Sequence, residues 1–258
     1  RRGYIDHSDS LGATARFGEG DVQWMTAGQG IVHAEMFPLV HKDVGNPTEL
    51  FQIWLNLPST SKMVAPHFSM LWSEQMPHVA PLDAVGTKVV LIAGQLEEAK
   101  PPAPPPNSWA SNPHAEITIC TVDIATGGRW QLPAAKAHLN RVLYLFSGDA
   151  VVVAGQVVHS GHAIQLAPDA DVSLQNDGGP AQLLLMQGRP IGEPVAQHGP
   201  FVMNSQQEIR QAMMDYQACG FGGWPWPDDG PVHPREAGRF ARYPDGTVIT
   251  PEVSEAAE

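Results

Sequence analysis

Residues 20–35 read GDVQWMTAGQGIVHAE, and this stretch decides the fold class. Residues 21–25 have the composition of a β-strand, and the glycines that follow predict a turn into a second strand over residues 31–37. Alternate residues of a strand share a face, so His33 and Glu35 point to the same side. If that side is a barrel interior, they form half of a metal site; otherwise they are a solvated or hydrogen-bonded pair.

Short strand-forming runs bounded by Gly, Asn, Asp or Pro recur along the rest of the chain. Further strands are expected over residues 50–57, 87–92, 117–124, 141–146, 150–153, 163–166 and 182–186. Many short strands at this spacing are typical of barrels and sandwiches, so we expect an all-β protein.

A proline-rich segment divides the chain, because residues 100–113 hold six prolines and suit neither a strand ladder nor a helix. The capping box Ser205 to Glu208, followed by apolar residues at helical spacing, predicts one helix near the C-terminus. The expected domains are a first barrel over 1–100, a linker over 101–113, a second barrel over 114–222 with a helix over 205–219, and an extended tail over 223–258.

A weak internal repeat indicates that the two halves are duplicated barrels. An ungapped alignment of residues 20–35 with 161–176 matches a glycine, strand, turn, strand pattern in both. It puts Leu174 and Asn176 where the first copy has its histidine and glutamate. Leucine has no donor atom and a neutral amide is a poor iron ligand, so the second copy is predicted to bind no metal.

The composition limits the classes of partner. The 258 residues carry a formal net charge of −12, so the chain has no cationic surplus for phosphates, and direct nucleic-acid binding is disfavoured. The longest apolar stretches fall far short of the roughly 18 residues of a membrane-spanning helix. Cys120 and Cys219 match no CxxC spacing and are expected to be reduced thiols, most simply buried small apolar residues. Reduced thiols suit a cytoplasmic protein, or a nuclear one in a eukaryote.

The other histidines are less promising as ligands. His7 lies in a turn-rich polar stretch and is expected to be a surface turn residue, and His41 is expected in a loop. His159 and His162 have no carboxylate near them in the sequence and are expected to be structural.

Residues 20–35 resemble the hallmark of the pirin family, and residues 50–58, 187–194 and 197–204 agree with it. The resemblance covers nearly the whole chain. It implies a bicupin, which is a chain of two cupin-type β-barrels, with Fe(2+) in the first barrel held by three histidines and one glutamate. His33 and Glu35 match two of those four ligands.

The chain departs from the family pattern at its beginning. The pattern supplies two more histidines from an HxH stretch upstream of the hallmark, and this sequence begins with Arg1 and Arg2, about where the following strand would start. The internal repeat agrees, since the second copy has an additional strand before the matching point. Either the sequence is an N-terminally truncated piece of a complete pirin or the protein has lost half of its metal shell; we favour truncation.

The resemblance implies two alternative functions. The first is a quercetin 2,3-dioxygenase, in which Fe(2+) binds a flavonol and O2, the ring opens with loss of carbon monoxide, and Glu35 also accepts the substrate's hydroxyl proton. The alternative is a non-enzymatic, metal-dependent regulatory protein that acts through protein partners, as transcriptional co-regulators do. Fold analogy alone does not rank the two.

Overall fold

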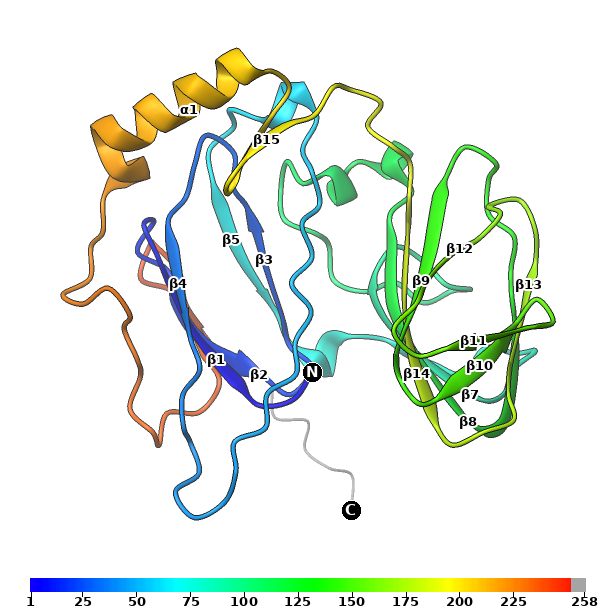
Figure 1. Ribbon diagram of the computed structural model, residues 1–258. Coiled ribbons are helices and arrows are strands. Elements are labelled where there is room, and N and C mark those ends of the chain that lie inside the picture. The colour runs from blue at the N-terminus through cyan, green and yellow to red at the C-terminus, as the bar shows by residue number, and fades with distance from the viewer. Residues whose placement is uncertain (252–258) are drawn as a thin grey trace. The chain divides into compact units, whose positions relative to one another are not determined.

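The computed structural model describes residues 1–251, which form two compact units. Unit 1 comprises Arg1–Glu74, Pro105–Trp109 and the chain from Gly192 onward, and unit 2 comprises Gln75–Pro104 and Ala110–Ile191. Each unit is built on a curled antiparallel sheet, which confirms an all-β fold with one helix near the C-terminus (Figure 1). The expected domain boundaries stay a prediction; by contact, unit 1 takes in both the first residues of the chain and its last described ones.

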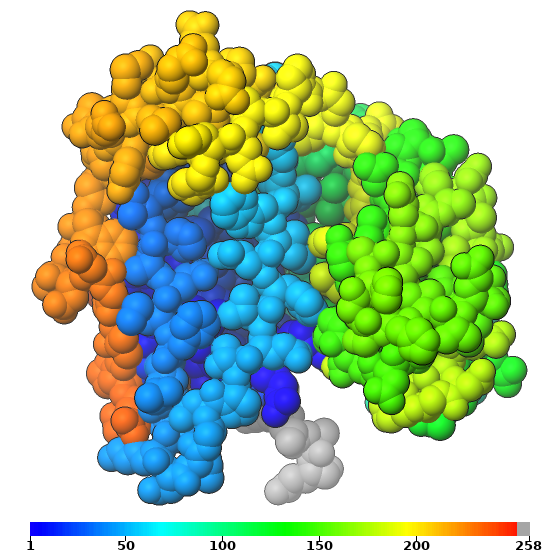
Figure 2. Space-filling view, viewed as in Figure 1, coloured from blue at the N-terminus to red at the C-terminus, as the bar shows by residue number. Residues whose placement is uncertain are grey.

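The main sheet of unit 1 has five strands in the order β18-β17-β2-β1-β4. Their bounds are β1 (Tyr4–Asp9), β2 (Thr14–Gly18), β4 (His33–Met36), β17 (Phe240–Arg242) and β18 (Val248–Ile249). Strand β1 lies between β2 and β4 and pairs antiparallel with both. Figure 2 shows part of the C-terminal segment of unit 1, in orange, against blue segments from the N-terminal part of the chain.

A buried ion pair ties the C-terminal segment to this sheet. Arg16 donates to both carboxylate oxygens of Asp6, from Nε at 2.7 Å and from Nη2 at 2.8 Å. Its Nη1 donates to the backbone carbonyls of Pro234 at 2.8 Å and Ala237 at 2.9 Å. The segment expected as an extended tail therefore adds two strands to the sheet, because the free edge of β2 offers unpaired backbone groups.

A second, two-stranded sheet, β3 (Val22–Thr26) with β5 (His67–Leu71), packs against the five-stranded one. The core between them contains Ile5, Ala13, Ala15, Phe17, Phe68, Met70, Trp72 and Ala241. Unit 1 also holds the hairpin β15 (Ala196–His198) and β16 (Phe201–Met203) and the helix α1 (Gln206–Cys219). The capping box is confirmed, since Ser205 Oγ accepts from the backbone N–H of Glu208, and Gly220 ends the helix with a φ of +56°.

Unit 2 is a nine-stranded antiparallel sheet. Its strands are β6 (His78–Val79), β7 (Val85–Ala93), β8 (Thr118–Leu132), β9 (Asn140–Ser147), β10 (Ala150–Val153), β11 (Gln156–His159), β12 (Ala163–Gln165), β13 (Val172–Asn176) and β14 (Ala181–Gly188). Its interior is packed with apolar side chains, including Trp130, Leu143, Leu174 and Leu183. The polar side chains buried in unit 2 include Arg141 and Asn176.

All but one of the strands expected from the sequence are found. The exception is residues 50–57, which within residues 1–251 make no ladder; beside them, Glu49 forms a single bridge to Arg2. Strand-forming composition needs a neighbouring strand, and none lies alongside. Five 3-10 turns complete the described structure, at Ser59–Ser61, Ser73–Gln75, Trp109–Ser111, Pro113–Ala115 and Gly220–Gly222. Over residues 1–251, every helix is too short or too polar to cross a membrane.

Candidate metal centre

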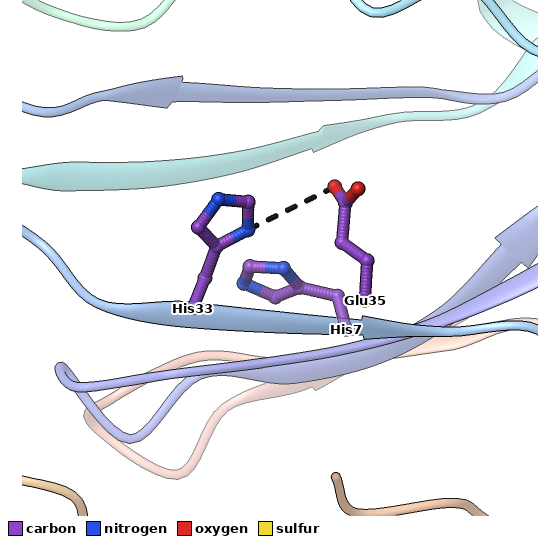
Figure 3. Close-up of side chains that lie close together, drawn as sticks. All are labelled: His7, His33 and Glu35. Carbon is purple, nitrogen blue, oxygen red and sulfur yellow. Dashed lines mark ion pairs between the residues drawn. The ribbon is translucent and has the colours of Figure 1, made fainter. Parts of the chain in front are cut away.

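Strands β1 and β4 bring three potential metal ligands together in unit 1. In the antiparallel register His7 lies opposite Glu35, and Asp9 lies opposite His33. Side chains directly opposite each other in such a pair share a face, so the histidines and the glutamate converge (Figure 3). The sequence predicted His33 and Glu35 on one face, and the structure adds His7.

The three side chains are close enough to be considered as one site. One potential ligand atom from each of His7, His33 and Glu35 lies within 4.8 Å of the others. His33 Nδ1 is 3.8 Å from Glu35 Oε1, and the two imidazole rings are 5.7 Å apart between centroids. His7 is fully buried, whereas the side chains of His33 and Glu35 are 32% and 22% exposed. The cluster therefore has one buried side and one side that a small molecule can reach.

His7 corrects an expectation from the sequence, because it lies inside unit 1 and not in a surface turn. Its ring stacks on Phe68 with centroids 5.1 Å apart, and its Nε2 is 3.1 Å from Asp9 Oδ2. Its Nδ1 is buried and has no hydrogen-bond partner. The stretch resembled a turn because polar residues occupy both faces of β1, and on the other face Asp6 binds Arg16.

Two glycines set the path of the chain into β4. Gly28 has a φ of +54° and Gly30 a φ of +131°, a region that side-chain-bearing residues rarely adopt. A Cβ atom on Gly28 would lie 2.1 Å from the carbonyl oxygen of Val64, and one on Gly30 would lie 2.4 Å from the Phe221 ring. The glycines are therefore needed for the approach that positions the following strand.

The surroundings of His33 favour its neutral form. Partial burial lowers the pKa of His33, and the neighbouring His7 lowers it further, while Glu35 and Asp9 act in the opposite direction. A neutral imidazole has the free lone pair that metal binding requires. The protonation state thus suits a ligand at neutral pH.

Comparison with known proteins identifies the family. Family models named Pirin and Pirin C-terminal cupin domain match residues 1–55 and 119–222. Pirin from Homo sapiens is 34% identical over 221 residues, which are 83% of this chain and 70% of that protein. The chain belongs to the pirin family. A Pseudomonas aeruginosa protein provisionally named quercetin 2,3-dioxygenase is 33% identical over 219 residues, or 84% of this chain and 72% of that one.

Solved structures agree with a pirin fold. The crystal structure of quercetin 2,3-dioxygenase from Acinetobacter baumannii has a TM-score of 0.75 and 28% identity, over 86% of this chain and 74% of that one. A second Acinetobacter baumannii structure of the same name has a TM-score of 0.72 at 20% identity, over 92% of this chain and 75% of that one, and supports the fold alone. The two barrels of this pirin are therefore of the cupin type.

The residues of the cluster fit a metal of the kind that pirins and other cupins bind. Two imidazoles and one carboxylate are the donor set of non-haem Fe(II) sites. The 3.8 Å between His33 Nδ1 and Glu35 Oε1 lies within the span of two ligands on one ion, because such bonds are about 2.0–2.2 Å long. The Nδ1 atom of His7 is buried and has no hydrogen-bond partner, and a metal ion bound to this nitrogen would supply one.

The second barrel of this pirin offers no comparable site. Leu174 is fully buried in the apolar core of unit 2. The Asn176 side chain donates to the carbonyls of Ile124 and Gly179 and accepts from the N–H of Gly178, so it is a structural residue. Within residues 1–251, the cluster on β1 and β4 is the one group of three metal-ligating side chains.

Three other histidines considered in the sequence lie outside the cluster. His41 is exposed in a loop of unit 1. His159 and His162 are exposed in unit 2, and His162 Nδ1 lies 2.9 Å from the carbonyl oxygen of His159. None of the three joins the cluster.

Proposed function

We propose that this pirin is, in its complete form with the full ligand set, an iron-dependent dioxygenase of the quercetin 2,3-dioxygenase type, with His33 and Glu35 as metal ligands. The cluster of two histidines and one carboxylate in the first cupin barrel carries the proposal. The relatives from Pseudomonas aeruginosa and Acinetobacter baumannii that bear this enzyme name support the choice of substrate class, a flavonol.

A bound Fe(2+) would supply the redox chemistry with O2. The chain's own residues have two tasks. His33 and Glu35 hold the ion on the side of the cluster that solvent reaches, where a flavonol hydroxyl can approach. A Glu35 carboxylate oxygen then accepts the proton of that hydroxyl, since a carboxylate next to the reacting group can act as a general base.

The proposed reaction balances with O2 as the only co-substrate. Both oxygen atoms of O2 enter the products, one ring carbon leaves as carbon monoxide, and the opened flavonol becomes an ester of two aromatic acid units. The proton that Glu35 accepts returns to the ester product. No external reductant is needed, because the flavonol itself is oxidised.

The test compares the 258-residue chain with an extended chain that carries the HxH stretch of the family pattern at its N-terminus. Each is loaded with Fe(2+) without oxygen and then mixed with quercetin in air-saturated buffer. An oxygen electrode and carbon monoxide detection measure turnover, and metal analysis measures iron per chain. We expect turnover in the extended chain and essentially none in the 258-residue chain, which has only part of the family's ligand set. In the extended chain, His33→Ala and Glu35→Ala should each lose both iron and turnover, because each change removes a ligand. His162→Ala, in unit 2, is the matched control and should keep both.

Two outcomes would count against the proposal. Full iron content in both His33→Ala and Glu35→Ala would show that the ligands are elsewhere. Stoichiometric iron in the extended chain with no oxygen consumption would reject the enzyme and leave the metal-dependent regulatory protein, which needs a bound ion and no turnover.

A further inference from the structure

We propose that His7 is a third metal ligand through its Nδ1 atom, and that Asp9 is the positioning residue that makes this atom available. The inference rests on the proposed metal site but not on its substrate. It concerns strand β1, which contains neither the HxE motif nor the HxH motif that the family pattern supplies.

Asp9 is held rigidly, and only one of its oxygens faces His7. Its Oδ1 accepts hydrogen bonds from the backbone N–H groups of Leu11 at 2.9 Å and Ala13 at 3.0 Å. Its Oδ2 lies 3.1 Å from His7 Nε2, and both side chains are fully buried. The backbone donors thus fix the orientation of the carboxylate with respect to the imidazole.

This contact decides which nitrogen of His7 carries the proton. A carboxylate can only accept hydrogen bonds, so Nε2 must be the donor. In the neutral imidazole the proton on Nε2 leaves a lone pair on Nδ1. The buried Nδ1 has no partner in the protein, and an N–H at that position would be a buried donor without an acceptor.

The register of the sheet places His7 beside the other two residues of the candidate site. His7 lies directly opposite Glu35, and its ring is 5.7 Å from that of His33. Figure 3 shows the His7 ring extending from β1 toward the other two side chains. A carboxylate that binds one nitrogen of a histidine while the other nitrogen binds a metal is a common arrangement, in which the carboxylate fixes the tautomer and the ring orientation.

Two substitutions separate the ligand from its positioning residue. His7→Gln keeps an N–H near the position of Nε2 for Asp9 but removes the nitrogen at the position of Nδ1. Asp9→Asn keeps the oxygen that the backbone N–H groups require and therefore turns its NH2 group toward His7. Nε2 must then accept, the proton moves to Nδ1, and the lone pair is lost while the fold is kept. His41→Gln, an exposed histidine of unit 1, is the matched control.

The first measurement is the affinity of the full 258-residue chain for Co(2+), by titration of its visible absorption, with circular dichroism to verify folding. We expect Asp9→Asn to weaken binding by about 10–100-fold, the usual effect of losing such a partner, and His7→Gln to weaken it at least as much. His41→Gln should bind as the wild type does. Wild-type affinity in a folded His7→Gln chain, or no Co(2+) binding by the wild type, would overturn the inference.

The second measurement needs neither metal nor substrate. Two-dimensional NMR of the imidazole nitrogens in the metal-free chain reports the tautomer of each histidine. We expect His7 to carry its proton on Nε2 in the wild type and on Nδ1 in Asp9→Asn, a change that a purely structural role for Asp9 would not produce. The proton on Nδ1 in the wild type would overturn the inference. A failure of quercetin turnover with these results intact would reject the proposed enzyme alone.

Discussion

Leu174 allows a quantitative test of the view that the second barrel is a packed support without a metal. Its side chain is fully buried in β13 and lies opposite Trp130 of β8 and Val153 of β10, both also buried. Leu174→Ala removes three carbon atoms, worth about 2.4 kcal/mol at about 0.8 kcal/mol per methylene. The remaining cavity adds to this cost because neighbours paired on both sides of β13 relax little, so the total should be about 2–5 kcal/mol.

Equilibrium urea unfolding followed by circular dichroism measures this loss. Hydrogen exchange of peptides from unit 2 assigns the loss to that unit. Val157→Ala is the matched control, because Val157 lies in β11 of the same unit and is 62% exposed, and it should change the free energy of unfolding by under about 0.5 kcal/mol. Metal content should be unchanged in both variants. A loss below about 1 kcal/mol for Leu174→Ala, or a loss of bound metal, would refute the reasoning.

Three further predictions concern other parts of the chain. Burial raises the pKa of the Cys120 thiol to about 12, whereas Cys219 is exposed on α1. A thiol reagent should therefore modify only Cys219 in the native chain and both cysteines after unfolding in urea. Rapid labelling of Cys120 in the native chain would contradict this. Gly28→Ala should lower the free energy of unfolding by about 1–3 kcal/mol in a thermal melt and weaken Co(2+) binding, because the left-handed backbone at Gly28 leads into β4. An unchanged stability and an unchanged Co(2+) affinity would mean that the turn adapts to the side chain. Asp6→Asn leaves the Arg16 guanidinium buried without its carboxylate and should lower the free energy of unfolding in urea by about 3–5 kcal/mol. A loss near zero would show that the backbone carbonyls of the C-terminal segment are enough to stabilise the buried guanidinium.

Most of the longer strands of the second barrel were predictable because their composition and turns are local signals, whereas β6, β11 and β13 were not among the strands expected from composition. Residues 150–153, for example, were expected as a strand and are β10. Strand β1 was missed for a physical reason, since both its faces are buried yet polar. The partners that make this possible lie far away in the sequence: Arg16 binds Asp6 and also carbonyls beyond residue 232. Local patterns do not contain such pairs.

The candidate site was half predicted. His33 and Glu35 were recognised because they alternate on a strand that follows a glycine turn. His7 and Asp9 have the same spacing, and that parallel was the signal available in the sequence. Its meaning depends on the register between β1 and β4, which places His7 opposite Glu35 and is known only from the three-dimensional structure. Cys219 was likewise misjudged as a buried residue, because its helix exposes that face.

The attachment of β17 to β2 has a consequence for how the protein is made. Three strands of the sheet that carries the candidate metal site, β1, β2 and β4, lie within the first 36 residues, yet the edge of β2 is covered only by residues 240–242. A ribosome that adds about 5–20 residues per second needs on the order of 10–50 s to reach that point after the first strands have emerged. Throughout this interval the edge of β2 and the buried charge of Arg16 lack their final partners, and an open edge is prone to pair with other chains. The first barrel to be synthesised is thus the last to be completed, so slow translation or early termination should affect the half with the candidate metal site before the other.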